Sequence, residues 1–281
     1  MSTNENKGKK AEVTALQAIS AEDRKDWISL AFVQAGICVC VPAFLLGALL
    51  AEAMPIWPAI ISGSLGYLIV VVGMVATGMI GCDLGLASCT CCQAGFGKSG
   101  ARFIVSTIFA VNMIGWFGIQ NGVCGEAFSN AMLAMTGWDI PVVVSNTIWG
   151  IIMLLTAVYG VHALEKLDKI SIPLLMIIMC YGTFLAFKVY GTGNLNDEGT
   201  VQSMSFMSGV ALSFNFTAVG TITGPDYTRF QKSRKDTVKS VFYGVFPMGV
   251  ITLIMGIVLT KLSGQYDISM VLIEVGLPLL G

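Results

Sequence analysis

The chain alternates between long stretches that contain no Asp, Glu, Lys or Arg and shorter polar segments that carry the charges. Each uncharged stretch comes near or above the roughly 18–20 apolar residues that cross about 30 Å of hydrocarbon as a helix. Buried helices of soluble proteins rarely run so long without a charge. We therefore expect an all-α membrane protein with about seven transmembrane helices. The expected spans are Trp27–Ala51, Ala53–Cys82, Phe103–Gly125, Ile140–Leu164, Ile170–Phe187, Gly199–Pro225 and Ser240–Thr260.

Helices suit these stretches better than the strands of a membrane barrel. Barrel strands alternate polar and apolar residues over about ten positions, whereas residues 67–72 and 173–179 are continuously apolar. The composition agrees with a lipid environment, because 12% of the residues are charged and a soluble domain carries about 25%. The net charge of −1 gives no reason to expect a nucleic-acid partner.

The polar and apolar segments divide the chain into three expected parts. Residues 1–26 form a polar cytoplasmic segment, residues 27–262 hold transmembrane helices 1–7, and residues 263–281 hold a short helix and the start of a truncated eighth segment. Because natural chains seldom stop at the entrance to an apolar segment, we expect a longer reading frame. No short apolar core with a cleavage site precedes Trp27, so the first helix is expected to direct insertion.

The positive charges predict the orientation in the membrane. Lys and Arg are enriched in cytoplasmic loops. If the N-terminus is cytoplasmic, all of the 16 Lys and Arg residues except Lys188 and Lys261 fall on the cytoplasmic side. The opposite orientation would reverse this distribution. We expect a multi-pass protein of the cell (inner or plasma) membrane with its N-terminus in the cytoplasm.

The eight cysteines and the lone His162 do not predict a metal site or an enzyme. Free Cys inside a helix behaves as a small hydrophobe, and no second cysteine pair follows Cys91 and Cys92 at zinc-site spacing. A soft-metal site in this cluster is the less favoured alternative to packing. Residues 94–100 resemble a phosphate loop, but its first glycine would have to stand where Cys92 is. We expect no catalytic residues, no bound metal and no cofactor beyond a coupling ion.

Two of the expected helices carry interruptions. The first contains Gly36 and Pro42, and the sixth contains a glycine- and threonine-rich run, residues 215–225, that ends in proline. Gly permits unusual dihedrals and Pro removes a backbone donor. Transporters bind substrate and ions near the midplane at such broken helices, often in matching positions of an inverted repeat. The two interruptions therefore favour a transporter.

The third expected helix has a polar and aromatic middle. Trp116 lies well inside its span, and Gln120 follows one turn later on the same face. An indole with a neighbouring carboxamide suits a flat heterocycle, which stacks on the ring and pairs its edge with the amide. Packing between helices, with Gln120 bonded to a neighbour, explains the same residues equally well.

Two motifs carry a resemblance to a known family. Residues 115–118 (Gly-Trp-Phe-Gly) and 224–230 (Gly-Pro-Asp-Tyr-Thr-Arg-Phe) are the most specific, with weaker similarity at residues 95–100 and at the glycine-containing start of the first helix. From about Asp26 to Gly281 the chain resembles the nucleobase–cation symporter family, and within it the cytosine and purine permeases.

The resemblance implies a twelve-helix protein with a five-plus-five inverted repeat. It implies that Trp116 stacks on one face of a base and Phe216 on the other, with Phe214 as the alternative aromatic. It further implies hydrogen bonds to the base edge from Gln120, Asn215 and backbone around Gly36. The coupling cation would sit between the break in helix 1 and helix 8, at the carbonyls of Gly36 and Cys40 or their neighbours. Asp226 and Arg229 are best read as a helix cap and a topology-setting charge.

The expected function is import of a nucleobase, cytosine or a purine, by cation symport with alternating access and with Na⁺ or H⁺ as the coupling ion. Helices 1, 2, 6 and 7 would rock against helices 3 and 4. One alternative is another small heterocycle, such as a hydantoin, allantoin or a vitamin-like ring. A second alternative is a non-transporting truncated remnant. The sequence leaves the oligomeric state open.

Overall fold

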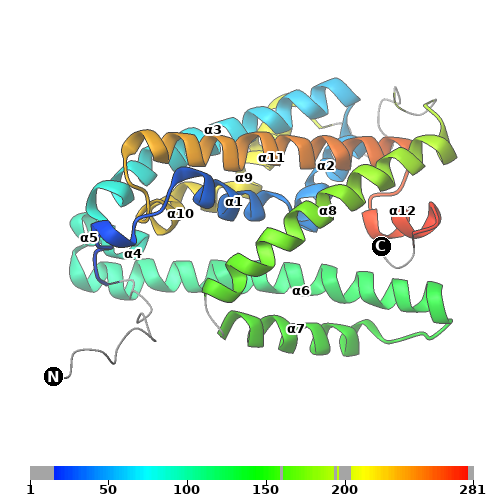
Figure 1. Ribbon diagram of the computed structural model, residues 1–281. Helices are drawn as coiled ribbons and strands as arrows, with labels where there is room; N and C mark the ends of the chain where they lie inside the picture. Colours follow the sequence, from blue (N-terminus) through cyan, green and yellow to red (C-terminus); the bar gives the residue numbers. More distant parts are fainter. Residues whose placement is uncertain (1–15, 159–160, 193–194, 196–203, 278–281) are drawn as a thin grey trace.

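The computed structural model describes residues 16–158, 161–192, 195 and 204–277, and the side chains of residues 157–169 lie outside this description. Within it the chain is helical and forms no strand beyond one isolated bridge between Lys25 and Gln231, so the all-α prediction is confirmed (Figure 1). The α-helices are α1 (Trp27–Cys38), α2 (Val41–Ala53), α3 (Ile56–Leu84), α4 (Ser88–Cys91), α5 (Gln93–Gly100), α6 (Ser106–Thr136), α7 (Val142–Val158), α8 (Val161–Tyr190), α9 (Phe206–Thr217), α10 (Val219–Thr228), α11 (Arg234–Ser263) and α12 (Ile268–Glu274).

The described helices supply the expected membrane spans. Five are long and apolar enough to cross a bilayer, and the bent pair α1–α2 makes a sixth. The shorter apolar helix Val142–Thr156 stands where the fourth of the seven spans was expected. Several boundaries differ from the expected ones. The third span continues to Thr136 instead of ending at Gly125, and α8 begins at Val161 and takes in a charged stretch for which the sequence predicts a loop. That stretch is rich in Ala, Leu, Glu and Lys, which favour helix. The expected start of an eighth segment lies mostly outside the described residues.

α11 is the centre of a tight helical bundle, and three of its glycines make this possible. Gly244 faces the backbone of Ala31 in α1, Gly249 faces the ring of Tyr67 in α3, and Gly256 lies against the backbone of Phe44 in α2. A Cβ added at any of the three would overlap its neighbour. Small residues allow membrane helices to approach this closely.

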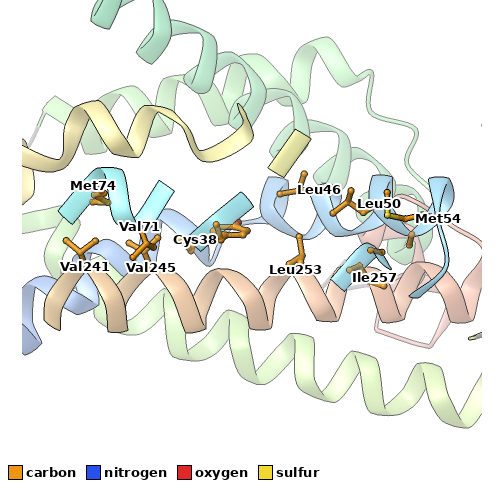
Figure 2. Close-up of a cluster of buried hydrophobic side chains, with 13 residues drawn as sticks. Cys38, Leu46, Leu50, Met54, Val71, Met74, Val241, Val245, Leu253 and Ile257 are labelled. Atoms are coloured by element: carbon orange, nitrogen blue, oxygen red, sulfur yellow. The ribbon is translucent and has the colours of Figure 1, made fainter. Parts of the chain in front are cut away.

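The buried apolar cluster lies where α11 meets α1, α2 and α3. Figure 2 shows its side chains in a row along α11, facing the neighbouring helices. Leu253 and Ile257 are completely buried there, and so is Tyr67. The labelled members of the cluster are Cys38, Leu46, Leu50, Met54, Val71, Met74, Val241, Val245, Leu253 and Ile257.

α9 and α10 run parallel to α3 and are fastened to it by hydroxyl groups. Ser213 Oγ donates to Gly63 O at 2.7 Å, and Thr228 Oγ1 donates to Gly78 O at 2.7 Å. In both bonds the partners are 150 positions apart in the sequence. α9 and α10 therefore keep the same register against α3. Such bonds satisfy hydroxyls that would be costly to expose to hydrocarbon.

A short N-terminal segment, which we call the clasp (residues 19–26), ties the end of α3 to the connection between α10 and α11. Ile19 N donates to Gly85 O, and Lys25 N donates to Phe230 O. Arg24 reaches both sides, because its Nη1 donates to Cys82 O and to Gln231 O, each at 3.0 Å. Lys232 forms an ion pair with Asp26 at 2.6 Å.

α6 and α7 form an antiparallel hairpin beside this bundle, and α8 crosses between the two (Figure 1). In an apolar 18-residue window of the continuous helical run Gln93–Thr136, which includes α6, 6% of the residues are buried. α6 therefore rests mainly on α7 and touches the bundle at few places, which makes each of those places informative.

We predict that Arg24→Ala loosens the clasp. Two carbonyls lose a charged donor, and a hydrogen bond to a charged group contributes about 1.5–3 kcal/mol, so the thermal midpoint in detergent should fall by several degrees. Thermal unfolding followed by size-exclusion chromatography measures this. Arg102→Ala is the matched control, since Arg102 is exposed and lies over the ring of the adjacent Phe103. Equal midpoints for the two variants would show that the clasp adds no stability.

Candidate functional site

The helix 1 break lies between α1 and α2, which meet at an angle of 52°. Val39 and Cys40 leave the helical region, with φ/ψ of −92°/75° and −145°/155°. α1 ends with Val39 N bonded to Ala35 O, and the next backbone bond joins Ala43 N to Cys40 O. Pro42 sits in the first turn of α2, where its missing N–H costs nothing. The interruption expected around Gly36 and Pro42 is therefore present, and it frees backbone groups inside the span.

The helix 6 interruption is milder than the one in helix 1. Ala218 separates α9 from α10 but keeps helical dihedrals of −56° and −30°, and the two helices pass as one span, Phe206–Thr228. Pro225 lacks the N–H that would bond Thr221 O four residues earlier. Thr77 Oγ1 of α3 donates to that carbonyl at 2.6 Å. A threonine that our sequence analysis did not single out thus compensates for the proline.

The structure brings together side chains from the middle of α6, from α9 and from the helix 1 break. The rings of Trp116 and Phe216 are in edge-to-face contact, with centroids 5.1 Å apart and planes at 85°. Gln120 lies one turn along α6 and interacts with the thiol of Cys40 in the break. Trp116, Gln120 and Phe216 are all partly buried. We call Trp116, Gln120, Phe216 and Cys40 the junction.

The other residues expected at the site lie around the junction or apart from it. Asn215 is exposed, and Phe214 is half-buried without a described ring partner. Of the two aromatic candidates, Phe216 is the one that meets Trp116. Since the two rings touch, the structure has the space between them closed.

Gly36 faces a cavity of about 330 Å³ between the helix 1 break and α8. Val39 and Ser171 also line it, together with Ile172, Leu174, Leu175 and Ile178. Cys40 is not part of this lining, so the break presents Gly36 to the cavity and Cys40 to the junction. The sequence analysis had not identified Val39 or Ser171, because a valine next to a break and a serine in an apolar run carry no distinctive signal.

Asp226 and Arg229 lie at the end of the molecule where the clasp sits. Asp226 Oδ1 accepts from the backbone N–H of Ser88 at 3.1 Å, in the first turn of α4, so this carboxylate caps a helix other than its own. The Arg229 guanidinium lies 4.8 Å from the centroid of the Phe230 ring. Partial burial lowers the pKa of Arg229, and the charge of Asp226 opposes this shift.

The cysteine cluster next to α4 offers little chemistry. Burial raises the pKa of the Cys91 and Cys92 thiols, and neighbouring cysteines and Asp226 add to the effect. The thiolates that bind metals or act as nucleophiles are therefore scarce at neutral pH. In the part of the chain that the structure describes, no three His, Cys, Asp or Glu residues are grouped so that they could hold a metal ion.

An apolar helical bundle with a broken first span, whose unwound residues meet aromatic and amide side chains from two other spans, has the organisation of a secondary transporter. Comparisons with known proteins identify the family. A family model described as permease for cytosine/purines, uracil, thiamine and allantoin matches residues 19–275. The chain belongs to this family of nucleobase–cation symporters, which are permeases and not enzymes.

Individual relatives agree with this assignment. The cytosine permease of Escherichia coli strain K12 is 28% identical over 258 residues, which cover 90% of this chain and 59% of that permease. The purine-uracil permease NCS1 of Arabidopsis thaliana is 25% identical over 247 residues, covering 78% of this chain and 41% of its own length. This chain thus spans about three-fifths of the length of the bacterial cytosine permease.

Solved structures share the fold. Mhp1, a nucleobase-cation-symport-1 family transporter in a closed conformation with bromovinylhydantoin bound, matches with a TM-score of 0.82 at 18% identity, covering 96% of this chain and 63% of Mhp1. Its inward-facing conformation matches with a TM-score of 0.78 at 17% identity. The expected transporter fold is confirmed. The seven spans of this chain correspond to part of the longer Mhp1 chain.

We predict that the contact between α3 and α9 depends on Gly66. A Cβ at this position would lie 2.5 Å from Ser213 Cβ and 2.7 Å from Phe214 N, and Phe216 follows on the same helix. Gly66→Ala should destabilise the protein by about 1–3 kcal/mol through overpacking, measured as a lower thermal midpoint. Gly118→Ala in α6, which meets nothing within 4 Å, is the control. A Gly66→Ala midpoint as high as that of the control would contradict the close approach.

Proposed function

We propose that this protein imports a nucleobase through the cell membrane by cation symport, with its N-terminus in the cytoplasm. The observation that carries the proposal is the junction, where Trp116, Gln120 and Phe216 converge beside the helix 1 break. Two aromatic faces and a carboxamide are the groups that a planar, hydrogen-bonding heterocycle requires. Relatives named for cytosine, for purines and uracil, and for allantoin support this substrate class.

The closed state of the junction supports an alternating-access mechanism. A base cannot lie between Trp116 and Phe216 while their rings are 5.1 Å apart and edge to face, because a stacked base needs a stacking distance on each side. Binding therefore separates α6 from α9. The two helices belong to different parts of the fold, the α6–α7 hairpin and the bundle. Opening and closing of the junction is thus a movement of one part against the other, which is the alternating access expected of helices 1, 2, 6 and 7 against helices 3 and 4.

The charge distribution supports the proposed orientation of the N-terminus. The clasp, Arg229 and the α10–α11 connection lie at one end of the molecule, and Arg234 there pairs with Asp83 through two guanidinium nitrogens. Basic residues gathered at one end favour the cytoplasmic side. We assign this end to the cytoplasm.

The coupling ion is proposed to bind at the cavity between the helix 1 break and α8. Its lining includes Gly36 and Val39 at the break and Ser171 of α8, and none of its lining residues has a titratable side chain. Carbonyls of an unwound helix are typical ligands of Na⁺ in transporters, whereas a proton would need a titratable acceptor. The cavity therefore favours Na⁺ over H⁺ as the driving ion, and the expected ligands are Gly36 and its neighbours rather than Cys40.

The alternative cargo is another small heterocycle, such as a hydantoin, and one observation supports it. The matched structure of Mhp1 has bromovinylhydantoin bound, and a hydantoin is also a planar ring with alternating donors and acceptors. Competition by unlabelled cytosine, adenine, uracil, allantoin and a hydantoin against a labelled base separates the two.

We predict that Trp116→Ala abolishes substrate accumulation. Labelled cytosine should accumulate in cells that express the complete gene, and the variant should lose at least about tenfold in uptake because stacking and its buried area are lost. Trp138→Ala is the control, because Trp138 is 70% exposed. Surface expression of both variants is measured in parallel. Uptake that is equal in the two variants would remove the stacking site, and uptake of none of the five compounds by the wild type would remove the substrate class.

We predict that uptake depends on Na⁺ and that Ser171→Ala weakens this dependence. Replacing Na⁺ by choline should suppress accumulation, and the variant should require a severalfold higher Na⁺ concentration for half-maximal uptake. Thr147→Ala on α7 serves as the control, because its hydroxyl bonds to Val143 O of its own helix. Uptake that persists in choline but collapses with a proton ionophore would identify H⁺ as the coupling ion.

A further inference from the structure

The contact between α6 and α7 is built from two reciprocal asparagine–glycine pairs. A Cβ added at Gly125 of α6 would overlap Asn146 Oδ1 of α7, and one added at Gly150 of α7 would lie 3.2 Å from the amide of Asn121 of α6. The two pairs are one helical turn apart on each helix and run in opposite directions, as an antiparallel hairpin requires. Each asparagine thus lies against the glycine of the other helix, and we call this contact the asparagine seam.

The seam is the polar, buried side of helices that are otherwise exposed. Gly125 and Ser129 are the buried residues of α6, and Ser145 of α7 is fully buried. Ser129 Oγ donates to Ile140 O, and the rings of Phe128 and Trp149 meet edge to face with centroids 5.5 Å apart. Four further polar atoms are buried here without a partner among the described residues: Asn121 Oδ1, Ser145 Oγ, Asn146 Oδ1 and Trp149 Nε1.

The close asparagine–glycine contacts limit how the helices can turn. Rotating α6 would bring a residue with a Cβ into the place of Gly125, where a Cβ overlaps Asn146 Oδ1. Rotation would also break the hydrogen bond from Ser129 Oγ to Ile140 O. The arrangement therefore favours one rotation of α6 about its own axis over its neighbours.

That rotation decides where the junction residues point. At about 100° per residue, Gln120 lies about 40° from Trp116 around α6, whereas Asn121 and Gly125 lie about 140° and about 180° from it. The seam is thus on the back of α6, opposite the face that meets Phe216 and Cys40. When the seam face of α6 is held against α7, the opposite face, which carries Trp116 and Gln120, has a fixed orientation as well.

We propose that Asn121 and Asn146 are positioning residues, which hold α6 in the rotation that presents Trp116 and Gln120 to the substrate. The effect of these residues on transport rests on the proposed function. The fixed rotation of α6 does not, because it depends only on the contact between α6 and α7. The seam makes α6 and α7 one unit, so that closing on a substrate moves both helices without turning α6.

The glycines provide a graded test. Gly125→Ala should turn or displace α6, because the new Cβ overlaps Asn146. Gly150→Ala should have a small effect, since the amide of Asn121 can yield by a few tenths of an ångström, and Gly122→Ala should have none, because nothing lies within 4 Å of it. Adding Asn146→Ala to Gly125→Ala should restore the helix in part, because the backbone N of residue 146 still lies 2.8 Å from the new Cβ. Asn146→Ala alone provides a variant without overpacking.

Two readouts separate the rotation from transport. The first is the rate at which N-ethylmaleimide alkylates Cys124, which follows Gln120 by one turn and is half-buried, measured by mass spectrometry of the peptide that contains it. The second is the KM for cytosine uptake by the protein from its complete gene. We expect Gly125→Ala to change the alkylation rate severalfold and to raise the KM about tenfold, with partial recovery in the double variant and values within twofold of wild type for Gly122→Ala.

The outcomes are distinct. Equal alkylation rates in Gly125→Ala, Asn146→Ala and Gly122→Ala would overturn the seam as a rotational lock. Changed rates with an unchanged KM would overturn its role in positioning the substrate residues. Changed rates in a protein whose wild type takes up no base would uphold the lock and remove the proposed function instead.

Discussion

Close approach of helix backbones through glycine is the constraint on which this structure depends. In a bilayer the lipid tails are as apolar as the helix surfaces, so helices gain little from the hydrophobic effect when they associate and rely on dense packing and polar contacts. Gly244, Gly249 and Gly256 allow three other helices to lie close against α11. Gly47 of α2 in turn lies against the backbone of α11. With α11 at its centre, the bundle supports the break between α1 and α2 from behind. A broken span would otherwise be the weakest part of the protein.

Polar side chains add hydrogen bonds to the close packing that the glycines allow. These bonds divide the molecule into two parts. Hydroxyls of Ser213, Thr228 and Thr77 fasten α9 and α10 to α3, and the clasp joins the ends of the same helices. The α6–α7 hairpin has its own polar contacts in the asparagine seam. The junction lies where the two parts meet, with Trp116 and Gln120 on one and Phe216 and Cys40 on the other. A contact shared between two internally fastened parts can open without breaking either of them, which is what the proposed binding at the junction requires.

The sequence predicts the spans well and the contacts between them poorly. Long uncharged runs reflect the thickness of the bilayer, and Gly36 together with Pro42 marks a real break. The spans and the break can therefore both be recognised in the sequence. The clasp was not visible, because Arg24 lies in a polar segment whose charge has an ordinary explanation in topology. Thr77 was missed for a similar reason, since a threonine in a helix gives no sign that it serves a carbonyl freed by a proline 148 residues later. Likewise, the family resemblance implied that Trp116 shares a site with Phe216 or Phe214, but only the fold shows that the rings of Trp116 and Phe216 are in contact.

That contact has an energetic consequence for a transporter. Edge-to-face pairing contributes about 0.5–1.5 kcal/mol beyond the area it buries, and a substrate bound between the two rings as proposed would have to replace it with two new stacking contacts. A ring with two extended faces does so, whereas a small aliphatic solute would leave the indole and the phenyl ring facing an unfilled gap. If a substrate binds at the junction as proposed, the closed pair of rings would favour flat ligands. The amide of Gln120 would then distinguish among them, because a bound ligand that lacks the matching edge would leave this amide unpaired. Gly36 and Val39 of the same interrupted stretch line the cavity next to α8, so the proposed substrate and ion sites would share the helix 1 break.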